Sequence, residues 1–242
     1  MGSVFCSDDF EVKTAANGEQ GMEQALSCIP DIIVSDIMMP VMNGIRMCKM
    51  LKEDVRTSHI PVILLTAKDS LQDKEEGYQV GADSYLTKPF SATLLHSRIH
   101  NLLESRKRLT ERFSTGTPHH SMDDKRALLA DSLNKLDNEF IEKINQLIEA
   151  RLSSEKIDIG YLADNMCMSK STLYRKMKAL TGLSTNEYVR KIKMQYAERL
   201  LLEGRYNVSE IAFKVGLNSV VYFRQCFKEE FGVLPSEYLK QS

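Results

Sequence analysis

The stretch that most constrains this 242-residue chain covers residues 31–44. It contains three β-branched aliphatic residues in a row, Ile32–Val34, which predict a strand buried on both of its faces. The strand is expected to end at Asp36, because Pro40 and Gly44 predict a loop. A carboxylate at that place lies where open α/β sheets carry their chemistry. For a single Asp, a helix cap or a turn remains an equally good explanation.

Strand-like and helix-like segments alternate on both sides of this stretch. Further strands are predicted over Phe10–Thr14, Pro61–Leu65 and Tyr85–Leu86, and helices over Glu19–Ser27, Gly44–Leu51, Leu71–Val80 and an apolar stripe from Leu94 to Leu103. Strands that alternate with helices indicate a parallel sheet that is covered on both faces.

Three of the predicted strands end in residues with complementary chemistry, Asp36, Thr66 and Lys88. Because parallel strands end at the same edge of a sheet, these side chains are expected to meet. A carboxylate, a hydroxyl and a cation are suited to capturing a phosphoryl group on Asp36, with Thr66 and Lys88 holding its oxygens. The alternative is three unrelated loop residues, which the shared strand ends disfavour.

Residues 8–105 resemble a response regulator receiver domain, which has the CheY-like, flavodoxin-like fold. The matching residues are Asp36 with Met38-Met39-Pro40 and Asn43-Gly44, Leu65-Thr66-Ala67, Gly81-Ala82-Asp83 and Tyr85-Leu86-Thr87-Lys88-Pro89-Phe90. The resemblance implies a receiver over residues 1–108 in which Asp36 accepts phosphate from a histidine kinase. It also implies that Thr66 and Tyr85 reorient with the phosphoryl group, and that the peptide before Pro89 is cis.

The resemblance further implies a Mg²⁺ site formed by the Asp36 carboxylate and the Met38 carbonyl. However, the family begins with a buried strand that ends in an acidic pair, and no segment before Phe10 fits that strand. The missing strand would leave a gap in the sheet and an exposed edge on the Asp36 strand. We therefore expect an incomplete receiver, weak or absent Mg²⁺ binding and poor phosphorylation of Asp36.

The charges are divided unevenly along the chain. Residues 1–105 carry 9 Lys and Arg against 15 Asp and Glu, whereas residues 151–242 carry 15 against 10. An acidic front and a basic back predict two domains with different partners. No apolar run is long enough for a membrane span, and the five cysteines form no C-x-x-C pair, so a cytoplasmic protein with reduced thiols is expected.

The middle of the chain is predicted to be a flexible linker over residues 109–124, because it is polar and lacks an apolar period. An amphipathic helix, or two, is predicted over Leu128–Leu152. Its apolar stripe is explained by a core, and a coiled-coil contact in a homodimer is the open alternative.

From Ile157 onward the sequence repeats itself with an offset of about fifty residues. Leu162-Ala163, Leu173, Met177-Lys178, Gly182 and Glu187-Tyr188 correspond to Ile211-Ala212, Phe223, Phe227-Lys228, Gly232 and Glu237-Tyr238. Each copy predicts a short helix, a tight turn and a longer helix. Gly216 supplies positive φ in the second turn, and Cys167 stands at its place in the first. Ser184 and Glu187 predict a capping box on the helix between the copies.

Two helix-turn-helix units joined by one helix resemble the AraC-type DNA-binding domain, and the resemblance covers about residues 140–242. The match is strongest over Ser209–Ala212, Val215–Leu217, Tyr222-Phe223, Phe227-Lys228, Phe231–Val233 and Pro235–Tyr238. It implies an all-α domain over residues 125–242, with two recognition helices that enter successive major-groove segments of double-stranded DNA.

The start of each recognition helix is expected to face the bases. The predicted contacts are Ser169, Lys170, Ser171, Tyr174 and Arg175 in the first copy and Asn218, Ser219, Val220, Arg224 and Gln225 in the second. Arg175 and Arg224 suit guanine and Gln225 suits adenine, while an exposed Val220 suits a thymine methyl group. Lys176, Lys178 and Lys228 are predicted to contact phosphate or only solvent. Tyr222 is predicted to lie in the core or against the backbone.

Together these features predict a DNA-binding transcription regulator of a two-component phosphorelay, controlled by phosphorylation of Asp36. The alternative is the C-terminal part of a membrane hybrid sensor kinase whose incomplete receiver is not phosphorylated. An enzyme acting on a diffusible substrate is disfavoured, because no substrate pocket or general base is evident. A third hypothesis is a protein-interaction module whose helix-turn-helix pair no longer binds DNA.

Overall fold

The computed structural model describes residues 10–67, 80–114, 134–153 and 157–241. The chain divides into two compact units, Met1–Arg108 and Leu109–Ser242. None of the described helices combines the length and the apolar character needed to cross a bilayer.

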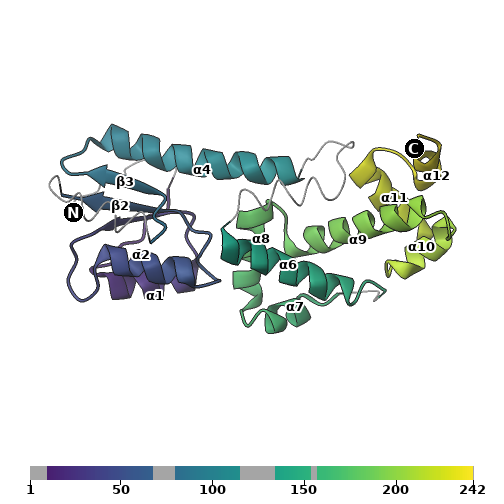
Figure 1. The fold of residues 1–242 in the computed structure, drawn as a ribbon, viewed down its shortest axis with the longest axis horizontal. Coiled ribbons are helices and arrows are strands. Elements are labelled where there is room, and N and C mark those ends of the chain that lie inside the picture. Colours follow the sequence, from purple (N-terminus) through teal and green to yellow (C-terminus); the bar gives the residue numbers. More distant parts are fainter. Residues whose placement is uncertain (1–9, 68–79, 115–133, 154–156, 242) are drawn as a thin grey trace. The chain divides into compact units, whose positions relative to one another are not determined.

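The first unit is a parallel sheet with helices on both faces. Its described elements are α1 (Gly18–Cys28), β1 (Ile33–Asp36), α2 (Gly44–Glu53), β2 (Val62–Thr66), β3 (Ser84–Thr87) and α4 (Ala92–Ser114). The strand order is β1-β2-β3, with both pairs parallel (Figure 1). The alternation of strands and helices and the predicted parallel sheet are therefore confirmed.

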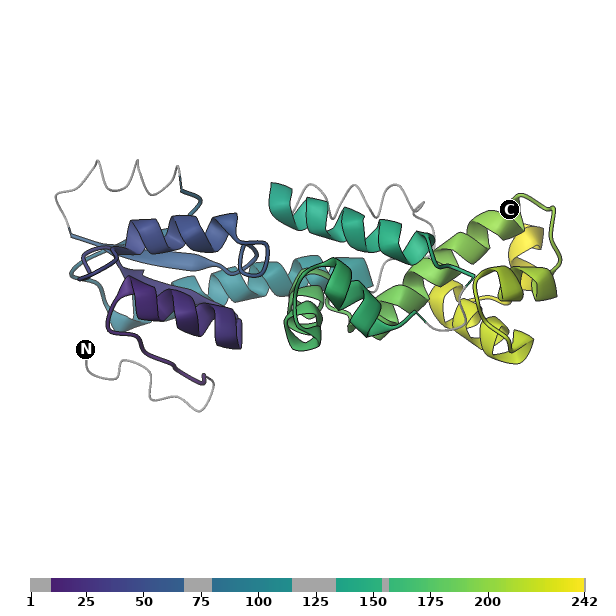
Figure 2. The ribbon, with the colours of Figure 1, turned by 90° about the horizontal axis from the view of Figure 1, so that it is seen from below.

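The central strand β2 divides the core into two layers. Val62 and Leu64 pack in one apolar cluster with residues of α1 and α2, such as Leu51. Ile63 and Leu65 point to the opposite face and pack against Leu95 and Ile99 of α4 and against Leu86 of β3. Figures 1 and 2 show α4 on one face of the sheet and the α1–α2 pair on the other. All five residues of β2 are buried, as its unbroken aliphatic run predicts.

The prediction of a strand over Phe10–Thr14 is wrong. These residues form no ladder, and the side chains from Glu11 to Thr14 are exposed. A strand needs a neighbour for its hydrogen bonds, and among the described residues none pairs with β1 on the edge away from β2. For the same reason Ile32–Val34 are half-buried, and their predicted burial on both faces is also wrong.

Helix α4 extends further than its apolar stripe indicates, since it continues to Ser114. The predicted linker is therefore helical over residues 109–114, and residues 115–124 lie outside the described part. Good helix formers and an i,i+4 ion pair between Glu104 and Arg108, at 3.5 Å, favour this continuation. Most of the helix predicted over Leu71–Val80 also lies outside the described part.

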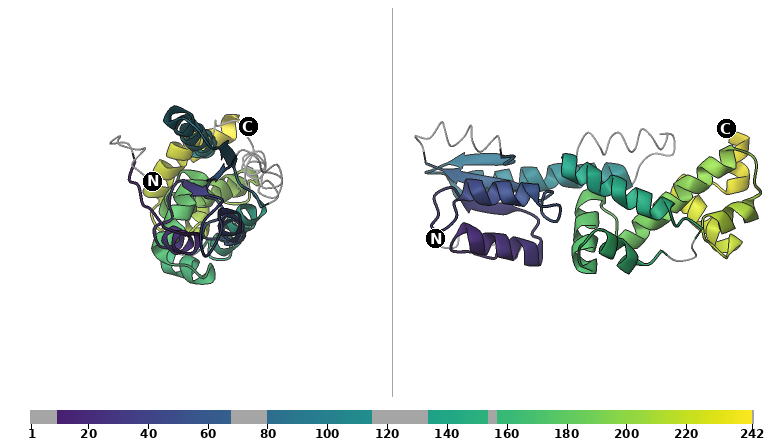
Figure 3. Two further views of the ribbon diagram at one scale, coloured as in Figure 1. Left: turned by 90° about the vertical axis from the view of Figure 1, so that its left-hand side faces the viewer. Right: turned by 60° about the horizontal axis from the view of Figure 1, so that its bottom comes forward.

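The second unit is built from helices alone. They are α6 (Lys135–Glu149), α7 (Ile159–Asn165), α8 (Lys170–Thr181), α9 (Thr185–Leu202), α10 (Val208–Lys214), α11 (Val220–Phe231) and α12 (Pro235–Gln241). Helix α6 confirms the described part of the helix predicted over Leu128–Leu152. Figure 3 shows α9 running from the α7–α8 pair to the α10–α11 pair.

The two helix pairs are duplicated down to their turns. Gly216 has a φ of 67° in the second turn, and Cys167 takes up the same left-handed conformation in the first, with a φ of 54°. Ser184 and Glu187 form the predicted capping box at the start of α9. The second pair is held on α9 by a core that includes Met194, Ala197, Leu201, Ile211, Phe223 and Phe227. The two predicted helix-turn-helix units are therefore confirmed as folded units.

Candidate functional site

Three strand ends of the first unit form a single polar site. In the sheet register Asp36 is paired with Leu65, and Thr66 with Thr87, so the predicted residues meet at one edge. Lys88 follows β3 directly, and its Nζ donates a hydrogen bond to the Asp36 carboxylate. The ammonium therefore reaches across β2 and supplies the cation next to the candidate phosphoacceptor.

The other two residues predicted for this site, Thr66 and Tyr85, make contacts with groups other than the Asp36 carboxylate. Thr66 is 1% exposed, and its hydroxyl donates to the carbonyl oxygen of Ala67 at 3.1 Å. Tyr85 is half-buried against the core layer on the side of α1 and α2. The peptide bond between Lys88 and Pro89 is cis, which confirms what the resemblance implies.

The described residues offer a Mg²⁺ ion few ligands. Asp36 contributes one carboxylate, whose Oδ2 accepts from Lys88 and whose Oδ1 accepts from the Met38 N–H at 3.2 Å. The Met38 carbonyl, which the resemblance gives as the second ligand, stays a prediction, and the Met38 residue is exposed. Within residues 10–67 and 80–108, no group of three acidic, His or Cys side chains could hold a metal. These residues do not fit a complete magnesium site, and weak binding stays a prediction.

Gly44 holds the backbone of the site in place. Its N–H donates to the Ile37 carbonyl at 2.9 Å, and Asn43 caps α2 by accepting from the Arg46 N–H at 2.8 Å. A Cβ added at Gly44 would lie only 2.2 Å from the carbonyl oxygen of Asp36. Only glycine permits this approach, so the Asn43-Gly44 turn fixes Asp36 as well as ending the strand. This second role is not visible in the sequence pattern.

Two of the residues predicted to contact bases are the N-cap residues of the recognition helices. Ser169 and Ser219 are the N-cap residues of α8 and α11, and their hydroxyls accept from the N–H groups of Thr172 and Tyr222. Nine of the ten predicted DNA contacts are exposed, namely Ser169, Lys170, Ser171, Tyr174, Arg175, Asn218, Ser219, Arg224 and Gln225. The exposed faces of α8 and α11 can therefore meet a ligand, while base reading stays a prediction.

The prediction that Val220 is exposed is wrong. Val220 is half-buried and packs against the core of the second helix pair. The exposed valine is its neighbour Val221, at 77%. Tyr222 is 47% exposed, so it does not lie in the core, and its contact with the backbone stays a prediction.

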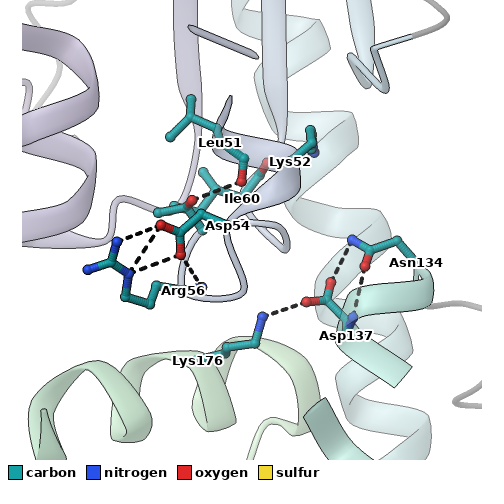
Figure 4. A network of polar contacts seen from close by, with 9 residues as sticks. Leu51, Lys52, Asp54, Arg56, Ile60, Asn134, Asp137 and Lys176 are labelled. Atoms are coloured by element: carbon teal, nitrogen blue, oxygen red, sulfur yellow. Dashed lines mark hydrogen bonds and ion pairs between the residues drawn. The ribbon is translucent and has the colours of Figure 1, made fainter. Parts of the chain in front are cut away.

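The prediction for Lys176 is also wrong. This side chain is 0% exposed, and its ammonium pairs with Asp137 of α6 at 2.5 Å (Figure 4). Lys176 can therefore contact neither phosphate nor solvent. Its position on the buried stripe of α8, three residues after Leu173, is the signal that could have found it. Lys178 and Lys228 are exposed, so phosphate contact stays a prediction for both.

A family model described as the response regulator receiver domain matches residues 1–100, and one described as a helix-turn-helix domain matches residues 162–241. Over 233 residues, or 95% of this chain, the sequence is 35% identical to Histidine kinase P4 of Formosa agariphila. The chain spans 16% of the length of that kinase.

Two further relatives each match one half of the chain. RpaA of Synechocystis sp., described as a DNA-binding dual master transcriptional regulator, is 39% identical over 102 residues, which is 42% of each protein. The solved C-terminal domain of AraT, a response regulator from Geobacillus stearothermophilus, is 29% identical. That match covers 43% of this chain and 85% of the AraT domain, with a TM-score of 0.39. The family matches show that this chain joins a response regulator receiver domain to a helix-turn-helix domain of the AraC type.

Proposed function

We propose that this chain is a sequence-specific DNA-binding transcription regulator of a two-component phosphorelay, acting in the cytoplasm. The observation that carries the proposal is the mounting of two exposed recognition helices, α8 and α11, on the single helix α9. A rigid spacing between two such helices suits two successive major-groove segments. The excess of Lys and Arg after residue 150 favours an anionic partner.

Each of the two recognition helices would contact a different set of bases. Arg175 on α8 and Arg224 on α11 are exposed and would each bind a guanine through two hydrogen bonds. Gln225 donates to Glu229 at 3.1 Å. Since a carboxylate only accepts, this bond directs the Gln225 Nε2 toward Glu229, and the second N–H and the Oε1 remain for adenine. Lys178 and Lys228 would contact phosphate.

The receiver would control this activity through Asp36. A carboxylate oxygen of Asp36 attacks the phosphorus of a kinase phosphohistidine, and the histidine nitrogen leaves. The Lys88 ammonium, already bonded to Asp36, balances the added negative charge. Thr66 and Tyr85 would reorient with the phosphoryl group and shift the receiver between two states. That shift would alter homodimerisation or release the DNA-binding half.

The test is binding to a duplex that the chain itself selects from a random pool. The expected result is a dissociation constant that rises steeply with salt and a preference of roughly a thousandfold or more for the selected duplex. Equal binding to selected and scrambled duplexes would exclude sequence-specific reading and favour a protein-interaction module.

A second candidate is that the chain belongs to a hybrid sensor kinase and that its receiver, which lacks a complete Mg²⁺ site among the described residues, is poorly phosphorylated. The match to Histidine kinase P4, which extends over both domains, supports it. Acetyl phosphate followed by intact-mass measurement tests it, with Asp36→Asn as the control. Slow labelling supports the second candidate, and labelling at the rate of a complete receiver contradicts it. The coding region upstream of Met1 would show whether a kinase shares the reading frame.

A further inference from the structure

The recognition helix α8 carries a fully buried ammonium group. Lys176 is 0% exposed, and its Nζ donates to Asp137 Oδ1, whose side chain is 3% exposed. The second carboxylate oxygen of Asp137 accepts from the Asn134 side chain at 2.8 Å (Figure 4). The Lys176 ammonium also lies 4.9 Å from the ring centre of Phe140. These contacts tie the buried ammonium of α8 to α6.

A buried pair of this kind is costly to form and rarely adds net stability over an apolar replacement. What the pair does provide is a fixed orientation of α8 relative to α6. A short ion pair tolerates little rotation of either helix, whereas apolar contacts tolerate more. Lys176 immediately follows Arg175 along α8, and Tyr174 precedes both. A rotation of α8 that breaks the pair would therefore also move the exposed side chains that are proposed to meet DNA.

We propose that the Asp137–Lys176 pair positions recognition helix α8 for reading its half-site, which makes α6 a part of the first DNA-reading unit. The proposal rests on the DNA-binding function proposed above. Helix α6 lies before the range matched by the helix-turn-helix model, which begins at residue 162. It is nevertheless fixed at a second point, since the buried Tyr188 hydroxyl of α9 donates to Asn145 at 2.9 Å.

The second copy lacks this arrangement. The repeat places Cys226 at the position of Lys176, and Cys226 is a buried core residue of the second helix pair. Helix α11 is instead paired with α9 itself, through Lys191 and Glu230 at 3.4 Å. Loss of the Asp137–Lys176 pair should therefore affect the first half-site and leave the second unaffected.

The experiment uses the full chain and its selected duplex, with single-base changes placed in each half-site. The first half-site is the one whose discrimination Arg175→Ala lowers. The test variant combines Asp137→Leu with Lys176→Met, because removing both charges avoids an unpaired buried charge that could unfold the domain. Competition binding gives the discrimination ratio at each half-site, and thermal melting by circular dichroism reports folding.

The test variant is expected to melt at or above the wild-type temperature, while discrimination at the first half-site falls roughly tenfold and the second is unchanged. The matched control, Lys191→Met with Glu230→Gln, is expected to spare the first half-site. Wild-type discrimination at both half-sites in the test variant would show that the pair is only structural. An equal loss at both would also overturn the proposal. A wild-type chain without any discrimination would refute the proposed function itself.

Discussion

Lys88, the residue after β3, donates a hydrogen bond to the carboxylate of Asp36 at the end of β1, although β2 lies between these strands. The contact links the ends of β1 and β3, the two outer strands of the described sheet. It exists only because the parallel register brings the three strand ends to one edge. The candidate phosphoacceptor is therefore held by a cation before any phosphoryl group arrives.

Replacing Lys88 by Met is expected to slow phosphoryl transfer to Asp36, because the cation that balances the transferred charge is lost. The initial rate of labelling by acetyl phosphate should fall by roughly a hundredfold. Lys107→Met, at an exposed position of α4, is the matched control and should label at the wild-type rate. Unchanged labelling of Lys88→Met would exclude a role for this cation.

Replacing Gly44 by Ala is expected to destabilise the first unit by about 2 kcal/mol or more, because the added Cβ would lie 2.2 Å from the Asp36 carbonyl oxygen. Gly21→Ala is the control. Its Cβ would lie 2.8 Å from the Met47 sulfur, which belongs to a flexible side chain that can move away, and 3.9 Å from the Ala15 Cβ, an ordinary contact. Urea unfolding measures both free energies, and an equal effect of the two substitutions would contradict the close approach at Gly44.

The cysteines are expected to differ in reactivity. Burial raises the pKa of the Cys48 thiol to about 11, although the positive charge of Lys52 acts in the opposite direction. At pH 8 only about a thousandth of Cys48 is then thiolate, and the side chain is enclosed. Brief treatment with iodoacetamide followed by peptide mass measurement should modify the exposed Cys167 and spare Cys48. Labelling of Cys48 as fast as of Cys167 would show that the core around α2 is open.

Tyr238 is expected to make the second unit sensitive to high pH. Burial, together with a hydrogen bond to Glu198, raises the pKa of Tyr238 from 10.0 to about 12. The folded state therefore holds this proton more tightly than the unfolded state does. The resulting stability is complete below pH 10 and is lost as the pH rises toward 12.

Tyr238→Phe tests this prediction, because the ring contacts with Phe227 and Phe231 remain and only the hydroxyl is removed. The difference in melting temperature between wild type and variant should shrink between pH 10 and pH 12. A difference that stays constant across this interval would contradict the raised pKa.

Much of the fold follows from local sequence patterns. The aliphatic run of β2, the capping box at Ser184 and the positive φ at Gly216 were all predictable from residue type and spacing. The meeting of Asp36 with Lys88 also followed, because the ends of parallel strands share an edge.

The missed features depend on partners that are distant in the sequence. Phe10–Thr14 alternates like a strand but has no described neighbour to complete its ladder. Lys176 lies on a buried stripe, yet its partner Asp137 is 39 residues away, and no periodicity reveals such a pair. Val220 and Val221 are equally apolar, and only the packing of α11 against its core decides which of them is exposed.

The most direct measurement of the central claim is base discrimination by the two recognition helices. Arg175→Ala and Arg224→Ala should each reduce the affinity for the selected duplex by about 1–3 kcal/mol and should relax specificity at different positions. Arg205→Ala, an exposed arginine outside both recognition helices, should leave the preferred bases unchanged. Competition binding at fixed salt gives all three values. Loss of discrimination at two separate positions would support the account, and unaltered base preferences in both recognition-helix variants would contradict it.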